Sequence, residues 1–319
     1  MAYSIEDKLI IGITSSALFD LREANEIFIT HGEKVYRDVQ INNENEPFNP
    51  GVAFKFIEKL LSLNSVYDQP FIEVILLSKN DPNTGLRVMN SIEYFNLNIT
   101  RAIFLQGKSA YLYSKALKVD LFLSSDPRDV ELAIENKVPA GLITGKVEDI
   151  SKNIKIQDDE LRIAFDFDGV IAGESSELFY QKEGLHKYQQ HESQNAEIPM
   201  EPGPLKPLLM KLSKIQKDEF EENLKNIHYR PKLRISIVTA RNAPAHKRVI
   251  KTIRHWGIDS INEAFFLGGI EKRKVLEIIN PHIFFDDQYL HIDPTKNIMP
   301  SVHIPFGMIN RLKKQDEEN

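Results

Sequence analysis

The chain has 319 residues, of which 42% are hydrophobic and 27% charged, enough for a sizeable core and for two domains. It has no cysteine, which excludes disulfides, thiolate metal sites, iron–sulfur clusters and a cysteine nucleophile. The net charge of -6 argues against non-specific nucleic-acid binding, no stretch has the roughly 20 apolar residues of a membrane span, and the first residues lack the pattern of a secretory signal. We therefore expect a cytoplasmic protein without a nucleic-acid or membrane partner.

Strand-like and helix-like segments alternate along the chain, which predicts an α/β fold. In the first half, strands are expected at 9–14, 71–78, 102–107, 119–125 and 140–144, and helices at 54–63, 88–94 and 126–137, with a mixed segment after the first strand. A polar run at 146–160 indicates a linker between domains 1–150 and 151–319. In the second half, strands are expected at 161–168, 233–240, 264–269 and 281–288, and helices at 207–215, 246–257 and 272–279.

The order of elements is the same in both halves, and corresponding positions are separated by nearly constant offsets. The offset is 152 for the pairs Thr14 and Asp166, Gly32 and Gly184, and Tyr36 and Tyr188. It becomes 161 for Ser78 and Thr239 and 162 for Ser124 and Asp286, with nine additional residues near 217–230. This regularity predicts two Rossmann-like units from an internal duplication.

Acidic residues follow the strands of the second half only. The acids are Asp166, Asp168, Asp286 and Asp287, whereas the corresponding positions of the first half hold Thr14, Ser16, Ser124 and Ser125. The carboxyl ends of parallel strands form the ligand-binding edge of a sheet, so these carboxylates should converge. Converging carboxylates repel one another unless a cation lies among them, and oxygen ligands suit Mg²⁺. We expect an active second half and a catalytically silent first half.

Four segments resemble, in order and spacing, the four motifs of the haloacid dehalogenase superfamily phosphatases: FDFDGVIAGE, IVTAR, the lysine of GGIEK, and IFFDDQ. Further segments are similar to the cytosolic 5'-nucleotidase I family: SSALF, ENEPFNPG, NSIEYFNL, GPLKPLL and VTARNAPAHKRVIKTIRHWGI. The similarity extends over nearly the whole chain. It implies two haloacid dehalogenase-like units with a small helical lid at about 171–233 of the second, and 5'-nucleotidase activity.

The resemblance also implies roles for individual residues. Asp166 corresponds to the nucleophile that becomes an aspartyl-phosphate, Asp168 to the general acid and base, Thr239 to the phosphate-binding hydroxyl and Lys272 to the phosphate-binding cation, with Lys274 as its rival. The Mg²⁺ ligands would be Asp166, Asp286 and the backbone carbonyl of Asp168. Positions behind these ligands or beside the substrate are Asp287, Ala240, Arg241 and Asn242.

The sequence leaves alternatives to these roles open. An aspartate after an apolar strand also caps helices, Thr239 can do the same, and the lid aromatics Phe179 and Tyr180 fit a helix core better than a base-stacking site. The favoured activity is Mg²⁺-dependent hydrolysis of nucleoside 5'-monophosphates, AMP being a plausible substrate. The alternatives are a phosphatase of a non-nucleotide phosphomonoester and a nucleotide-binding regulatory module. Family members also assemble, so a homo-oligomer is a further expectation.

Overall fold

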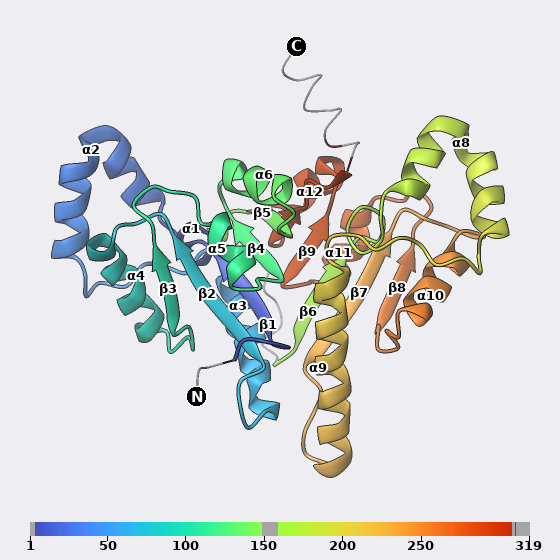
Figure 1. The fold of residues 1–319 in the computed structure, drawn as a ribbon, viewed down its shortest axis with the longest axis horizontal. Coiled ribbons are helices and arrows are strands. Elements are labelled where there is room, and N and C mark those ends of the chain that lie inside the picture. The colour runs from blue at the N-terminus through green and yellow to red at the C-terminus, as the bar shows by residue number, and fades with distance from the viewer. Residues whose placement is uncertain (1–3, 149–158, 308–309, 311–319) are drawn as a thin grey trace. The chain divides into compact units, whose positions relative to one another are not determined.

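The computed structural model describes residues 4–148, 159–307 and 310, and the chain divides into two compact units, Met1–Lys152 and Asn153–Asn319. Figure 1 colours the first unit from blue to green and the second from yellow-green to red. Most of the expected linker, the expected boundary at 150 and the charged tail at 311–319 lie outside the described residues. Within the described residues, no helix is both long enough and apolar enough to cross a membrane.

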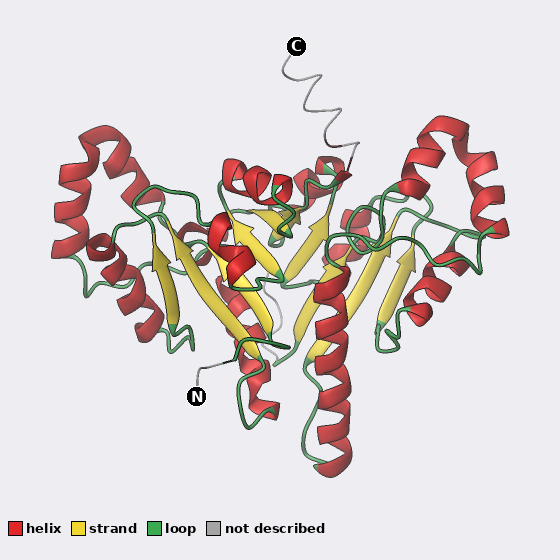
Figure 2. Cartoon of the chain, viewed as in Figure 1, coloured by secondary structure: helices red, strands yellow, loops and turns green. Residues whose placement is uncertain are grey.

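Unit 1 is built on a parallel sheet with the strand order β3-β2-β1-β4-β5. The strands are β1 (Leu9–Ile13), β2 (Ile72–Ser78), β3 (Arg101–Phe104), β4 (Leu121–Ser124) and β5 (Ala140–Thr144). Every residue of β1, β2 and β4 is buried, because the sheet is covered on its faces by other elements, and this explains their continuous apolar runs. The strands are drawn in yellow in Figure 2.

The helices of unit 1 are α1 (Ser15–Leu18), α2 (Arg22–Asn42), α3 (Phe54–Ser62), a 3-10 turn at Leu63–Val66, α4 (Pro82–Tyr94), α5 (Tyr111–Ala116) and α6 (Pro127–Glu135). Asp81 and Asp126 cap α4 and α6, and each is followed by a proline at the first helical position. Helix α2 occupies the segment that the sequence left unassigned. Most of its residues are exposed, and it bends at Gly32.

Unit 2 has a parallel sheet with the strand order β8-β7-β6-β9-β10. Its strands are β6 (Leu161–Phe165), β7 (Leu233–Thr239), β8 (Glu263–Phe266), β9 (Ile283–Asp286) and β10 (Ser301–His303). Its helices are α8 (Ser175–Gln194), α9 (Lys206–Lys225), α10 (His246–His255), α11 (Lys272–Ile279) and α12 (Tyr289–Thr295). One core cluster joins β6, β7 and β9 to α11 and α12 through Ala164, Val238, Phe284, Leu276 and Ile292.

The predicted α/β class is confirmed, and the strand order of unit 2 repeats that of unit 1 element by element. The segment 171–233 carries the helices α8 and α9, and α9 is 20 residues long where α3 of unit 1 has nine. The additional residues expected near 217–230 lie in the second half of α9 and in the loop that follows it. Helix α8 bends at Gly184 (φ 79°, ψ 171°), as α2 does at Gly32 (φ 80°, ψ 174°).

Candidate active site

Two neighbouring strands bring the first set of acids together. Strands β6 and β9 pair in parallel, and the backbone N–H of Asp166 donates to the carbonyl of Phe285 at 2.8 Å. Asp166 follows β6 directly, while Asp286 is the last residue of β9. All three of Asp166, Asp286 and Asp287 are buried. Three of the four acids expected to converge at the carboxyl edge of the sheet therefore do so, and Asp168 is the exception.

The three carboxylates form a group suited to a divalent cation. Oxygens of Asp166, Asp286 and Asp287 lie within 4.8 Å of one another, and Oδ1 of Asp287 is buried without a hydrogen-bond partner. Burial raises the pKa of Asp166 to about 7, and repulsion from Asp286 and Asp168 adds to this effect. Burial and the neighbouring Asp286 also raise the pKa of Asp287 well above its ordinary value. An orphaned carboxylate oxygen in an acidic group fits a hard cation with oxygen ligands.

One lysine of the described part of the chain partly neutralises this group. Lys272 Nζ lies 2.9 Å from Asp166 Oδ2 and 2.7 Å from Asp286 Oδ2, and the residue is only 1% exposed. Burial by itself would lower the pKa of Lys272, but Asp166 and Asp286 raise it above its ordinary value, so the ammonium is retained. Lys274, two residues further along α11, is exposed. The two lysines that the sequence could not distinguish by position are therefore separated by geometry.

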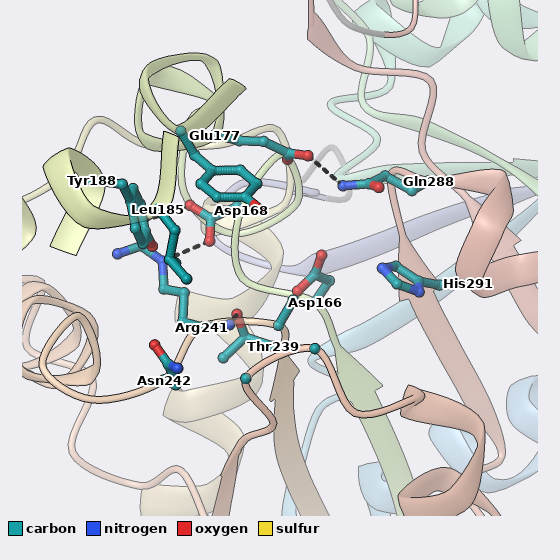
Figure 3. Close-up of a pocket in the computed structure, with 14 residues that line it drawn as sticks. Asp166, Asp168, Glu177, Leu185, Tyr188, Thr239, Arg241, Asn242, Gln288 and His291 are labelled. Carbon is teal, nitrogen blue, oxygen red and sulfur yellow. Dashed lines mark hydrogen bonds and ion pairs between the residues drawn. The ribbon is translucent and has the colours of Figure 1, made fainter. Parts of the chain in front are cut away.

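The side chain of Asp168 points to an arginine instead of the acidic group. Arg241 donates from Nε to Oδ2 at 2.6 Å and from Nη2 to Oδ1 at 2.7 Å, a bidentate arrangement. Its guanidinium is almost completely buried, and the surrounding carboxylates keep the pKa of Arg241 above the usual range in spite of burial. Figure 3 shows Arg241 lying below Asp168 with the contact drawn as a dashed line. Arg241 is therefore a buried residue that supports Asp168.

Asp166, Asp168 and Arg241 line a cavity of about 320 Å³, within the size range of small-molecule sites. Thr239, whose Oγ1 accepts a hydrogen bond from the Arg241 backbone at 3.2 Å, lies on its wall. The lining residues expected from the sequence are Asp166, Asp168, Thr239, Ala240, Arg241 and Asn242. Thr239 does not cap α10, because that helix begins only at His246. Lys272, Asp286 and Asp287 lie beneath this surface, in contact with or beside Asp166.

The structure adds lining residues that the sequence did not single out. Glu177 accepts a hydrogen bond from Gln288 Nε2 at 2.7 Å, and His291 lies close by on α12 (Figure 3). Burial raises the pKa of Glu177 to about 7, assisted by repulsion from Asp168 and Asp166. Tyr180, which we expected in a helix core, is 45% exposed and lines the cavity. The lining residues that come from α8 are Glu177, Tyr180, Leu185 and Tyr188.

Gly169 follows Asp168 in the chain and lies against the carboxyl group of Asp287. A substitution at this glycine therefore tests the geometry of the acidic group. The φ of Gly169 is +73°, and a Cβ there would lie 2.5 Å from Asp287 Cγ. We expect Gly169→Ala to displace Asp287 and weaken divalent-cation affinity about tenfold or more, since such displacement misplaces a ligand or its support. Thermal melting during a cation titration measures the affinity.

The control for this prediction is Gly32→Ala in unit 1. Gly32 has nearly the same φ, +80°, but nothing lies within 4 Å of the place that a Cβ would take there. Both variants should lose about 1–2 kcal/mol from left-handed backbone strain, and only Gly169→Ala should lose cation affinity. Equal cation affinity in the two variants would show that Asp287 is not needed for binding.

The fold and the site together define a class of protein: a parallel α/β unit with buried carboxylates, a lysine and a hydroxyl at the carboxyl edge of its sheet. A model of the 5'-nucleotidase family matches residues 1–311. Human cytosolic 5'-nucleotidase 1B is 33% identical over 300 residues, which cover 92% of this chain and 48% of that protein. The chain thus spans about half the length of the curated relative it matches. It belongs to the 5'-nucleotidase family, as its motifs predicted.

Proposed function

We propose that the protein is a Mg²⁺-dependent 5'-nucleotidase that hydrolyses nucleoside 5'-monophosphates, AMP among them, to nucleoside and phosphate. The observation that carries this proposal is the buried group of Asp166, Asp286 and Lys272 beneath a cavity of about 320 Å³, in a chain of the 5'-nucleotidase family. The name of the human relative describes a cytosolic protein, and we propose the same location for this chain.

The proposed reaction has two steps at phosphorus. A carboxylate oxygen of Asp166 attacks, the new O–P bond forms, and the bond from phosphorus to the nucleoside 5'-oxygen breaks while Asp168 gives that oxygen a proton. In the second step, water attacks the aspartyl-phosphate and Asp168 takes a proton from it. The O–P bond to Asp166 then breaks, and the carboxylate is restored as phosphate leaves.

The remaining residues hold the phosphoryl group. We assign the hydroxyl of Thr239 to one phosphoryl oxygen, and the ammonium of Lys272 to the charge that develops as Asp166 attacks. Asp166, Asp286 and the carbonyl of Asp168 would hold Mg²⁺, with Asp287 beside them. Bound there, the ion would screen the negative charge of the nucleophile from that of the phosphate.

We propose that α8 is the lid of this site and contacts the nucleoside. Tyr180, Leu185 and Tyr188 line the cavity, and an aromatic ring of this kind can stack on a purine or pyrimidine. The ring centroids of the two tyrosines are 5.6 Å apart. None of the lining residues comes from α9, so we restrict the lid to the first part of the segment expected at 171–233.

We also infer that the two units arose by duplication and that unit 1 has lost catalysis. The shared strand order and the bends at Gly32 and Gly184, which correspond at the offset of 152, support this inference. In unit 1 the positions corresponding to Asp166 and Asp286 hold Thr14 and Ser124, which cannot serve as a carboxylate nucleophile or a charged ligand.

A substrate panel tests the proposed activity. Phosphate release is measured from ribo- and deoxyribonucleoside 5'-monophosphates and from sugar phosphates, with Mg²⁺ or with EDTA. We expect Mg²⁺-dependent release from nucleotides. Equal rates with sugar phosphates would assign a general phosphatase in place of a nucleotidase. Tight nucleotide binding without release would indicate a regulatory protein.

The raised pKa of Asp166 predicts how Mg²⁺ binding depends on pH. A carboxyl whose pKa rises from 3.8 to about 7 on folding adds stability below pH 3.8, and this contribution is lost as pH rises through about 7. Above pH 7 the ionised group costs stability that a cation restores, because the cation binds the deprotonated form. We therefore expect Mg²⁺ to raise Tm more at pH 8 than at pH 6, by roughly 3 °C or more. Melting with NaCl of matched ionic strength is the control, and equal shifts at both pH values would contradict the prediction.

A further inference from the structure

One buried carboxylate near the site has no part in the reaction described above. Glu192 lies in the last turn of α8 and is fully buried. Its Oε1 accepts hydrogen bonds from Arg248 Nη1 at 2.8 Å and from Ser176 Oγ at 2.9 Å, and its Oε2 accepts one from Arg241 Nη1. The two arginines outweigh burial and hold the pKa of Glu192 below its ordinary value, so it carries a charge.

Glu192 and Asp168 bind opposite sides of the same guanidinium. Arg241 gives Nε and Nη2 to Asp168 and Nη1 to Glu192. The guanidinium is a rigid plane, so the bond to Glu192 fixes the direction of the two bonds to Asp168. Each oxygen of Asp168 accepts one bond from Arg241 and has a second lone pair, so Arg241 sets the direction in which both remaining lone pairs point.

Unit 1 contains a counterpart of this arrangement in which three of the four charged residues are replaced by uncharged ones. At the offsets of 152 and 161, Glu192 corresponds to Gln40 and Arg248 to Arg87, and Arg87 Nη1 donates to Gln40 Oε1 at 3.1 Å. The counterpart of Arg241 is Asn80, and that of Asp168 is Ser16. Unit 1 thus keeps the arginine that bonds to the helix, as Arg87, but it has uncharged residues at the positions that correspond to Glu192, Arg241 and Asp168.

The comparison between units separates two roles of the buried side chain. Holding the helix requires only an acceptor for the arginine of α10 or α4, which Gln40 provides even though its Nε2 has no hydrogen-bond partner. The charged carboxylate at this position occurs only in unit 2, the unit that also has the pair of Arg241 and Asp168. The charge of Glu192 is therefore connected with Arg241 and Asp168, and a glutamine is compatible with the fold at this position.

We propose that Glu192 is a positioning residue for the acid and base of the reaction: through Arg241, it holds the carboxyl group of Asp168 in the orientation for proton transfer. Because Glu192 belongs to α8, the helix that covers the nucleoside side of the cavity also fixes the group that protonates the leaving oxygen. The kinetic part of this inference rests on the proposed function.

The first experiment compares Glu192→Gln with Glu219→Gln. Glu219 is also fully buried on a helix of unit 2, and it accepts bonds from Tyr229 Oη at 2.7 Å and from the backbone of Lys232 and Leu233 at 2.8 and 3.0 Å. Both variants remove a buried charge, so both should melt earlier. We expect only Glu192→Gln to lower kcat, by about 10- to 100-fold, with KM within about threefold of wild type, as for a misplaced catalytic group. A fall of kcat that is equal in both variants would overturn the proposal.

The second experiment asks whether Glu192 acts through Arg241. Arg241→Asn gives position 241 the residue of the unit 1 counterpart, and Glu192→Gln is then added to it. We expect the added change to alter kcat by less than about twofold, because residues that act as a unit are not additive. A full 10-fold or larger loss in the Arg241→Asn background would show that Glu192 acts by another route.

A crystal structure of Glu192→Gln gives a readout that does not depend on turnover. We expect the guanidinium of Arg241 to leave its bidentate position on Asp168, and to keep it in Glu219→Gln. An unchanged Arg241 in Glu192→Gln would overturn the proposal even if kcat fell. If the wild-type protein releases no phosphate from nucleotides, the proposed function fails, and this structural comparison still decides whether Glu192 positions Asp168.

Discussion

Replacement of Asp166 by asparagine is expected to lower nucleotide hydrolysis by at least about 10⁴-fold, the size of loss seen when a covalent nucleophile is removed. The amide cannot form the aspartyl-phosphate, and it also gives up the contact with Lys272 Nζ at 2.9 Å. The fold should survive, because the ionised carboxyl is costly at this buried position, where its pKa is raised to about 7. Phosphate release under saturating Mg²⁺ and the melting temperature measure the two effects.

The matched control for this variant is Asp129→Asn in unit 1. Asp129 is buried too, and its carboxylate lies 2.9 Å from Lys79 Nζ and 2.7 Å from Ser109 Oγ. Its loss should reproduce the structural disturbance of separating a buried aspartate from its lysine, here the half-exposed Lys79, and leave hydrolysis near the wild-type rate. If Asp166→Asn kept more than about 1% of the rate, attack by this residue would be ruled out.

Replacement of Lys272 by methionine is expected to damage both stability and activity. Asp166 and Asp286 would lose the ammonium that lies 2.9 and 2.7 Å from them, and leaving buried charges unpaired costs about 3–5 kcal/mol. Because we propose that this ammonium stabilises the transition state, its loss should reduce kcat by at least about 10²-fold. Urea unfolding gives the stability, and Mg²⁺ should restore part of it because it binds the same carboxylates.

Lys274→Met is the control, since it makes the same chemical change on the same helix at an exposed position. It should alter the free energy of unfolding by no more than about 0.5 kcal/mol and leave kcat unchanged. Loss of activity in Lys274→Met with retention in Lys272→Met would reverse the assignment of the phosphate-binding lysine.

The sequence contains information beyond its motifs on the choice between Lys272 and Lys274. Lys272 is four residues before Leu276, which is fully buried, whereas Lys274 is four residues before Ile278, which is 85% exposed. Residues four apart lie on the same face of a helix, so Lys272 lies on the face of α11 that contains the buried Leu276. This inference requires knowing that Leu276 faces the core. The strands and their acidic ends were predictable for a similar reason, because buried parallel strands are continuous apolar runs and their ends are marked by Asp166 and Asp286.

The features that escaped prediction depend on contacts between distant positions. Helix α2 is exposed along most of its length, and the sequence left its segment unassigned. Glu192 bonds to Arg241 and Arg248, which are 49 and 56 positions away in the chain, and it lies in a polar stretch. Only the alignment of Glu192 with Gln40 could have singled it out, and that alignment gains meaning once the buried bonds of both residues are known.

The charge of the acidic group has a consequence for the order in which ligands enter. Among the residues that the structure describes, Asp166, Asp286 and Asp287 have one ammonium beside them, that of Lys272, while Arg241 is already paired with Asp168 and Glu192. When all three acids are ionised, the group carries two uncompensated negative charges, and a nucleoside monophosphate brings two more at neutral pH. Like charges at such separations repel strongly in a buried site. We therefore expect the proposed nucleotide substrate to bind more tightly once a divalent cation has neutralised the ionised group, and its affinity to fall as the cation concentration falls.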